Sequence, residues 1–392
     1  MYNNSMLNEI LKLLPRSIIK KVVDEHQGDR YTKTFTSWDH LVAMLTGQLA
    51  GVTSLRELEV TLNSHPECHY HLNTKNVKRS TLSDANNNRC FSIFRDITFG
   101  LLPSLSKHKK DLKNILTILD ASPLYLNSRG HEWANITLSR AYNKGLKLHV
   151  QYNHSEDHIE YVEVDDATIN DITVAQNLSL EANRIYVFDK GYCDYNWWKE
   201  IADKGSTFVT RLKKNASYEV KKSFEIAKKD KGLILKDQII SLSNQRPRAK
   251  KVNELAGVSL RLVEIKHPSG KEAPFMIVTN DLKASAQCIA DWYKERWSIE
   301  LLFKWLKQNL KIKRFMGESR NAIMIQIFVA LISYILLKLY NNITGGVLRL
   351  KDVCTLVKSN LFTRPKLYNR KRERRRILLE SSQQLSFGFY SW

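Results

Sequence analysis

The chain has 392 residues, and its 61 lysines and arginines exceed its 40 aspartates and glutamates, giving a formal net charge of +21. This length allows two or more domains and at least one large core. Because the positive charge is spread over several runs of lysine and arginine, it favours an extended polyanion over a small acidic metabolite as the binding partner. It predicts nucleic acid as the first partner and an anionic membrane as the second.

The most apolar stretch, 322–337, argues against the membrane. It is interrupted by Gln326 and Ser333 and is shorter than the ~20 residues a span needs, so we expect a buried core helix. The first residues lack the basic cluster, apolar core and cleavage site of an export signal. Five scattered cysteines without a CxxC pair favour a reducing setting, and we expect a cytoplasmic protein associated with the bacterial nucleoid.

Residues 1–110 are predicted to form a helical N-terminal domain. Apolar residues recur at helical spacing over Trp38–Leu49 and again over Leu55–Leu62. The turn between them offers Thr53 or Ser54 as the cap of the second helix.

A basic segment at 78–86, which includes Arg79, then opens a helix that we expect to continue through Ile97. A basic helix start can enter a DNA groove or bind phosphate. A capped helix with nothing bound explains the same residues, and this segment alone does not separate the two.

Histidine and cysteine gather in one short stretch of this domain, at His65, Cys68, His69 and His71. A structural zinc site usually takes four ligands from two separated pairs. No second pair follows, so we expect a polar loop between helices.

From residue 111 to 212 the pattern is typical of short strands and helices. We expect strands at Ile115–Asp120, Leu146–Tyr152, Ile159–Val164, Arg184–Asp189 and Thr207–Leu212, and helices at 172–180 and Tyr195–Asp203. Three strands, helix, strand, helix, strand is the order of the ribonuclease H-like α/β fold. In that fold the first and fourth strands are neighbours in a mixed sheet.

Residues 213–280 interrupt this core and are predicted to form a β-rich insertion. After a lysine-rich start, Val258–Ile265 and Phe275–Val278 flank a Pro-Ser-Gly turn as the strands of a hairpin would. Residues 281–345 then return to the core as its helical second part.

The helical second part contains a spaced motif, Tyr-x2-Arg-x3-Glu-x6-Lys, at Tyr293, Arg296, Glu300 and Lys307. At about 100° per residue, these side chains fall within roughly 60° of one line along a single helix, and Lys304 joins them. A glutamate among cations suits a site where a metal ion and a nucleic-acid phosphate meet. An exposed face with a Glu300–Lys304 ion pair explains the charge pattern equally well.

Residues 346–392 are predicted to be a basic C-terminal tail. The segment Arg364–Arg376 contains eight cations and one acid, Glu373. It is expected to bind a polyanion, and a solvated helix or disordered end is the alternative.

Two aspartates end predicted strands, Asp120 the first and Asp189 the fourth. If those strands are neighbours, both acids lie at one sheet edge and a later helix can lay Glu300 over them. Three such carboxylates repel unless divalent cations are bound, and hard oxygen ligands select magnesium or manganese. Aspartates that merely cap the following turns are the alternative.

These residues resemble those of the DDE transposases of bacterial insertion sequences, specifically the IS-four family defined by the Tyr-Arg-Glu-Lys signature. The signature is complete here, and similar segments are ERWSIELLFKWLKQNLKIKRFMG, VFDKGYCDY, FVTRLK, KRSTLSDAN and NAIMIQIFVALISYILL. The resemblance runs from about residue 30 to 340. It departs at Ala121, where the family often has serine or threonine, but the carboxylate before it is retained.

The resemblance implies a function and a set of site residues. Asp120, Asp189 and Glu300 would be the catalytic triad, binding two Mg²⁺ with Mn²⁺ as a substitute. The DNA-binding residues would be Tyr293, Arg296, Lys304, Lys307 and Arg79. The N-terminal domain would bind the terminal inverted repeats of double-stranded DNA, and joining two ends implies a homodimer on DNA.

Two other functions fit parts of the sequence. A DNA-binding protein without catalytic activity would explain the excess of basic residues, although such a protein gains nothing from three clustered carboxylates. A ribonuclease H-like nuclease would explain the acids without strand transfer.

Overall fold

The computed structural model describes residues 4–106, 115–126, 133, 144–226, 232–243, 252–267, 273–310 and 315–363. The chain divides into two compact units. The first comprises Met1–Leu105 with Trp305–Trp392, and the second comprises Ser106–Lys304. The predicted basic segment at 364–376 lies outside the described residues.

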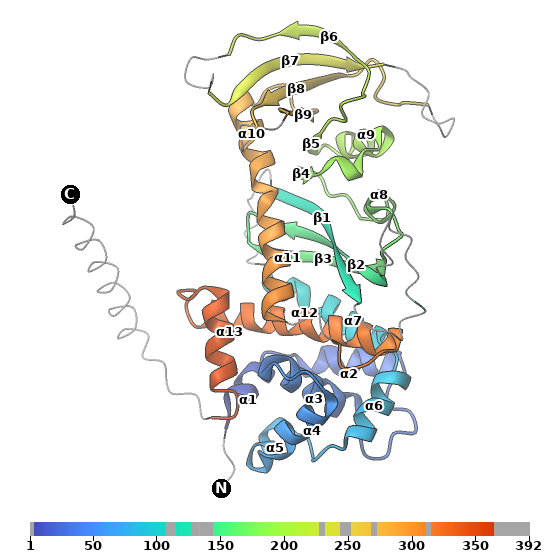
Figure 1. Cartoon of the computed structure of the whole chain (residues 1–392), viewed down its shortest axis with the longest axis vertical. Coiled ribbons are helices and arrows are strands. Elements are labelled where there is room, and N and C mark those ends of the chain that lie inside the picture. Colours follow the sequence, from blue (N-terminus) through green and yellow to red (C-terminus); the bar gives the residue numbers. More distant parts are fainter. Residues whose placement is uncertain are drawn as a thin grey trace, which may run out of the picture. The chain divides into compact units, whose positions relative to one another are not determined.

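The described part of the first unit is helical (Figure 1). Its elements are α1 (Met6–Leu11), α2 (Arg16–Glu25), α3 (Ser37–Ala50), α4 (Leu55–Asn63), α5 (Pro66–Leu72), α6 (Arg79–Asn88), α7 (Ser92–Leu101), the 3-10 helix η1 (Leu102–Leu105), α12 (Arg320–Ile343) and α13 (Leu350–Ser359). Helix α12 packs against α3 and α7 and forms the centre of this core.

The predicted core helix is confirmed in α12, where every residue from 322 to 337 is buried. By length and composition alone, α12 could cross a membrane. However, 89% of its most apolar window is buried inside the protein, as in the core helix of a soluble domain.

Local signals set several helix ends in this unit. Thr36 and Asp39 form a capping box that starts α3, and Gly51 ends it with a left-handed φ of 72°. Of the two predicted caps, Thr53 and Ser54, it is Ser54 that caps α4, by accepting a hydrogen bond from the Glu57 amide.

Two predictions for this unit were wrong. The long helix expected from residue 79 through Ile97 is interrupted between α6 and α7, because Arg89 has an extended backbone. Its guanidinium is held by the carbonyls of Phe35 and Thr36. The expected polar loop at 65–71 is instead mostly helix α5, which has a proline in its first turn. There Cys68 and His69 are buried, and His69 bonds the Leu62 carbonyl.

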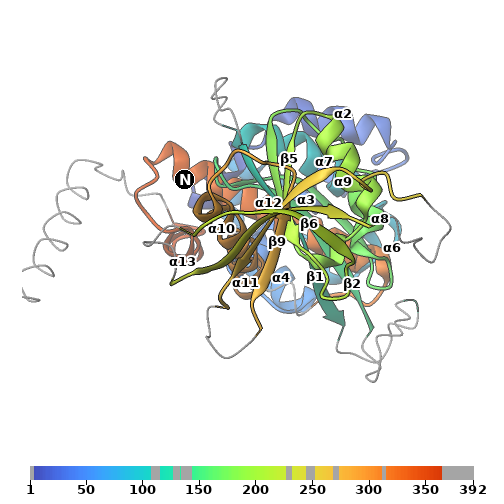
Figure 2. The same cartoon turned by 90° about the horizontal axis from the view of Figure 1, so that it is seen from above.

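The second unit is built on a mixed sheet with the order β3-β2-β1-β4-β5-β9-β8-β7-β6. The strands are β1 (Ile115–Leu126), β2 (Lys144–Asn153), β3 (His158–Asp166), β4 (Arg184–Phe188), β5 (Thr207–Arg211), β6 (Tyr218–Ser223), β7 (Ile234–Leu242), β8 (Ser259–Ile265) and β9 (Phe275–Thr279). The helices are α8 (Asp171–Ala175), the 3-10 helix η2 (Lys190–Tyr192), α9 (Tyr195–Asp203), α10 (Ala286–Glu295) and the start of α11 (Trp297–Asn309). Figure 2 shows how the strands turn progressively along the sheet.

The first and fourth strands are parallel neighbours, as the order of elements predicted. Strands of the 213–280 segment extend the same sheet, because β9 pairs with β5 and β8 pairs with β9. The predicted hairpin is present in β8 and β9, with Leu262 opposite Val278.

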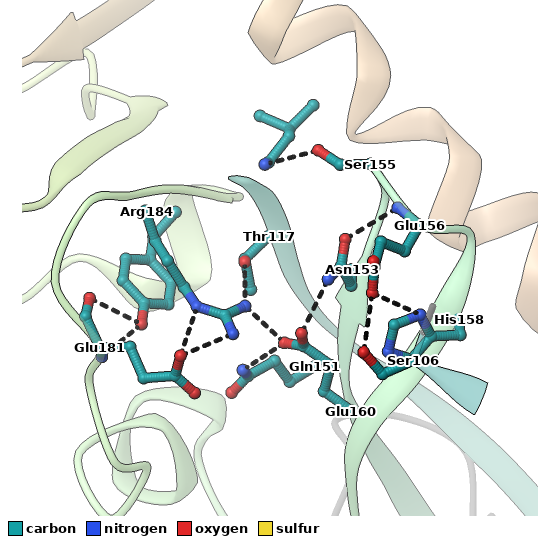
Figure 3. A network of polar contacts seen from close by, with 12 residues as sticks. Ser106, Thr117, Gln151, Asn153, Ser155, Glu156, His158, Glu160, Glu181 and Arg184 are labelled. Carbon is teal, nitrogen blue, oxygen red and sulfur yellow. Dashed lines mark hydrogen bonds and ion pairs between the residues drawn. The ribbon is translucent and has the colours of Figure 1, made fainter. Parts of the chain in front are cut away.

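A buried polar network ties four strands together at the start of β4 (Figure 3). Arg184 on β4 donates to Thr117 on β1 at 2.9 Å and to Glu160 on β3 at 2.7 Å. Glu160 also accepts hydrogen bonds from Gln151 and Asn153 on β2, each at 2.9 Å. A buried charge requires such partners, so the network holds the register of the strands that carry Asp120 and Asp189.

Candidate active site

Asp120 and Asp189 lie at equivalent positions, each directly after the last paired residue of the neighbouring parallel strands β1 and β4. The pairing of β1 with β4 ends at Leu119 and Phe188, and the two acids are the next residues of each chain segment. Asp189 follows its strand, as predicted. The prediction that Asp120 ends its strand was wrong, because β1 continues to Leu126 along β2. What ends at Asp120 is the contact with β4, so the carboxylate still lies at that edge.

The expected single helix from Tyr293 to Lys307 is divided at Arg296. Helix α10 ends at Glu295 and α11 begins at Trp297. The Arg296 amide bonds the Tyr293 carbonyl three residues back, which is the tighter 3-10 pattern. The angles of one straight helix therefore do not apply across this turn.

Arg296 joins two of the predicted catalytic acids. Its Nη1 lies 3.3 Å from Asp120 Oδ2, and its Nη2 lies 2.5 Å from Glu300 Oε1. The side chains of Arg296 and Asp120 are 16% and 18% exposed, and that of Glu300 is 36% exposed. Glu300 thus pairs with Arg296 rather than with Lys304, and the guanidinium separates the two carboxylates.

The electrostatics of Asp120 show that three acids share one neighbourhood. Burial raises the pKa of Asp120 to about 6, against an ordinary value of 3.8. The Ala121 amide and Arg296 oppose this rise, while the charges of Asp189 and Glu300 add to it. A cation that neutralised these acids would therefore be favoured at this edge.

The turn after β4 holds Asp189. Its side chain caps η2 by accepting a hydrogen bond from the Gly191 amide at 2.6 Å. The hydroxyl of the buried Thr210 on β5 donates to the Asp189 carbonyl at 3.2 Å. The first contact orients the carboxylate, and the second holds the backbone that carries it.

Tyr293 is buried beside these groups, and burial raises the pKa of its hydroxyl. The Arg296 guanidinium lies 6.0 Å from its ring centre. Arg211, in the segment FVTRLK, is not among the site residues predicted from the sequence. Its guanidinium lies 4.0 Å from the Phe275 ring, which contacts Tyr293 edge-on. The available signal was its place at the end of β5, beside the strand that leads to Asp189.

The remaining predicted DNA-binding residues lie further along α11 and on α6. Lys304 is exposed on α11, one turn after Glu300, and Lys307 is half-buried on the same helix. Arg79 is exposed as the first residue of α6 in the other unit. Trp297, the residue after Arg296, is a large apolar side chain that is 59% exposed.

The donor chemistry of this edge suits a hard divalent cation, since its ligands are carboxylate oxygens with excess negative charge. Within the described part of the chain, no three Asp, Glu, His or Cys side chains converge closely enough to hold one metal ion. Arg296 stands between Asp120 and Glu300. Cation binding would therefore require Arg296 to release at least one carboxylate.

Comparisons with known proteins identify families that this chain resembles. A family model described as a transposase DDE domain matches residues 112–336. A second model, described as a domain of unknown function, matches residues 2–75.

Individual relatives extend over most of the chain. A Sinorhizobium fredii protein named as a transposase is 33% identical over 320 residues, covering 79% of this chain and 85% of that protein. A Synechocystis protein named as a transposase for an insertion sequence element is 28% identical over 311 residues, 73% of this chain and 76% of that one. A solved piggyBac transposase synaptic complex with hairpin DNA aligns with 91% of this chain and 80% of its own, at 11% identity and a TM-score of 0.47.

Proposed function

The chain belongs to the family of transposases with a DDE domain, and we propose that Asp120, Asp189 and Glu300 form its reaction centre. The protein is an enzyme of DNA transposition, and DNA is its partner. The observation that carries the proposal is that Arg296 bonds both Asp120 and Glu300, while Asp189 directly follows the β4 residue that pairs with the neighbour of Asp120.

The proposed reaction has two parts. Water hydrolyses one strand at an end of the element and frees a 3′-hydroxyl, which then attacks the opposite strand or a target strand. The three carboxylates would hold two Mg²⁺, or Mn²⁺, which supply activation of the attacking oxygen and stabilisation of the leaving oxygen.

The cationic side chains act on the DNA. Arg296 would exchange its carboxylate partners for a phosphate, because its two Nη atoms, each bonded here to one acid, can donate together to two phosphate oxygens. Lys304 and Lys307 would neutralise backbone charge along α11. The Tyr293 hydroxyl would donate to a phosphate or pack on the sugar next to it.

The other parts of the chain have proposed roles of their own. Residues 1–110, with Arg79, would bind the inverted repeats, and 213–280 would be the β-rich insertion of a ribonuclease H-like core formed by 111–212 and 281–345. Residues 346–392 would be a basic tail that binds a polyanion. A homodimer on two DNA ends, membership of the IS-four group and a cytoplasmic, nucleoid-associated location complete the proposal.

The test replaces each acid by its amide, in Asp120→Asn, Asp189→Asn and Glu300→Gln. With DNA from the ends of the element, each variant should lose Mg²⁺-dependent nicking and keep its mobility shift. Asp203→Asn is the matched control, because it removes the same charge from an exposed position at the end of α9. Metal-dependent nicking by all three variants would refute the site.

Strand transfer needs a separate measurement, since a nuclease of the same fold would also nick. A pre-nicked end with a free 3′-hydroxyl should be joined to target DNA by the parent chain. Nicking without joining would favour the nuclease.

A further inference from the structure

His154, which the proposed reaction does not use, reaches both sides of the turn that carries Arg296. It lies in the loop between β2 and β3. Its Nδ1 lies 3.1 Å from the Oγ of Ser298, at the start of α11. Its Nε2 lies 3.2 Å from the Oε2 of Glu295, at the end of α10. The imidazole therefore bridges the tight turn between the two helices.

The two partners suit the two nitrogens of one imidazole. An ionised carboxylate can only accept a hydrogen bond, whereas a serine hydroxyl can also donate one. A ring that carries its proton on Nε2 donates to Glu295 and accepts from Ser298, so both contacts are satisfied at once. Because Glu295 is 47% exposed and solvent screens the pair, we expect these contacts to fix a direction rather than to contribute much stability.

The backbone around His154 is fixed to β1. The His154 amide donates to the Leu116 carbonyl at 2.9 Å, and the Leu116 amide donates to the Oγ of Ser155 at 3.0 Å. Asn153, the preceding residue, belongs to the buried network of Figure 3, which also shows Ser155. His154 thus connects the strand that carries Asp120 with the start of α11.

This connection differs from the ion pairs of Arg296. Arg296 also links α11 to β1, through Asp120 and Glu300, but cation binding would require it to release at least one of these acids. His154 bonds the two ends of the turn instead of the acids, so its contacts can persist after that release. The start of α11 would then still be held, and with it Glu300, which comes two residues after Ser298.

We propose that His154 is a positioning residue, which keeps Glu300 beside Asp120 once Arg296 has released its carboxylates. This inference rests on the proposed function, which makes Glu300 a member of the reaction centre. A turn held at both ends leaves the following helix little freedom to tilt, and a displacement of about 1 Å can cost about 100-fold in rate. Loss of the imidazole should therefore slow the reaction and leave DNA affinity unchanged.

The test measures two quantities with DNA from the ends of the element, the single-turnover rate of Mg²⁺-dependent nicking at saturating DNA and the dissociation constant from a mobility shift. His154→Ala should lower the rate about 10-fold, the lower end of the effect expected for residues that orient metal ligands, and keep the parental dissociation constant. His154→Gln should recover most of the lost rate, because its amide offers one donor and one acceptor.

Ser298→Ala is the second variant, and it keeps the test available if His154→Ala does not fold. It removes the hydroxyl that donates to the ring, so it should also lower the rate. Combined with His154→Ala, it should cost no more than His154→Ala alone. Ser217→Ala is the matched control, because it removes a hydroxyl from an exposed pair with Ser243 at 3.0 Å. Additive losses would show that His154 and Ser298 act separately and would contradict the inference.

Mn²⁺ binding without DNA, measured by isothermal titration calorimetry, provides a readout that does not depend on turnover. His154→Ala should weaken Mn²⁺ affinity about 10-fold, because Glu300 is no longer held in place for the cation. A merely structural role predicts instead a lower free energy of unfolding, with a parental nicking rate and parental Mn²⁺ affinity. A parental value of either the rate or the affinity would overturn the inference.

Asp120→Asn separates this inference from the proposed function. If Asp120→Asn abolishes nicking while His154→Ala nicks at the parental rate, the inference fails alone. If Asp120→Asn nicks like the parent chain, the proposed reaction centre fails, and the inference fails with it.

Discussion

Replacing Arg296 tests directly whether its guanidinium acts as the counter-ion of Asp120 and Glu300 when no divalent cation is bound. Arg296→Gln removes the charge and keeps a polar side chain. Without divalent ions we expect the second unit to lose stability, because Asp120 and Glu300 lose the counter-ion that they share.

The pKa of Asp120 limits the size of this loss. At pH 7.5 a carboxyl with a pKa of about 6 can take up a proton at a cost of about 2 kcal/mol, since one pKa unit is worth 1.36 kcal/mol. Glu300 adds little, because it is 36% exposed and solvent screens its pair. We therefore expect a loss of about 2 kcal/mol at pH 7.5. At pH 5.5 Asp120 is mostly protonated already, so the loss should fall below about 1 kcal/mol.

Urea unfolding with a chelator and with Mn²⁺ is the measurement. A cation at a hundred times its dissociation constant stabilises the folded state by about 2.7 kcal/mol. In the parent chain, the cost of displacing Arg296 offsets part of this stabilisation by the cation. Mn²⁺ should therefore raise the free energy of unfolding of Arg296→Gln by more than that of the parent chain. Arg349→Gln, which breaks an exposed pair with Asp352, controls for charge. If Arg296→Gln is less stable than the parent chain by the same free energy of unfolding with and without Mn²⁺, the reasoning is refuted.

Three further predictions concern other parts of the chain. Glu160→Gln removes the more buried of the two carboxylates that pair with Arg184, and Glu181 remains as a partner. It should lower the free energy of unfolding by about 2 kcal/mol, measured by urea unfolding, and a loss below about 0.5 kcal/mol would contradict the role of the network. Lys304→Gln and Lys307→Gln should each reduce the slope of log K for DNA binding against log salt by about 1, and an unchanged slope would exclude a phosphate contact. Burial lowers the pKa of His40 to about 3, so the folded state stays unprotonated while the unfolded state gains a proton below pH 6.5. Stability should therefore fall as pH falls from 6.5, by about 3 kcal/mol at pH 4.5, and this slope should be absent in His40→Gln.

The sequence alone predicted those features whose physical cause lies within a few neighbouring residues. The apolar composition and the length of 322–337 indicated a core helix, and Ser54 was one of two predicted caps because such a hydrogen bond spans only three residues. The order of strands and helices indicated that β1 and β4 are neighbours, because short crossover connections leave few alternatives.

Local patterns failed where a distant contact decides the backbone. Nothing near Arg89 predicts the end of α6, since the carbonyls that hold its guanidinium belong to Phe35 and Thr36. Likewise, an ideal helix period cannot show the tight turn at Arg296, which lies where its side chain reaches Asp120.

The chemical character of the site was therefore determined by the sequence itself: three acids, a spaced set of cations and a strongly basic chain are properties of residue type and spacing. Only the tertiary structure decided which charges meet. It paired Glu300 with Arg296 instead of Lys304, and it brought His154 to both sides of the turn at Arg296. The physical reason is that electrostatic interactions depend on distances of a few ångströms, and such distances between segments far apart in the chain are set by strand pairing and burial, which no local pattern contains.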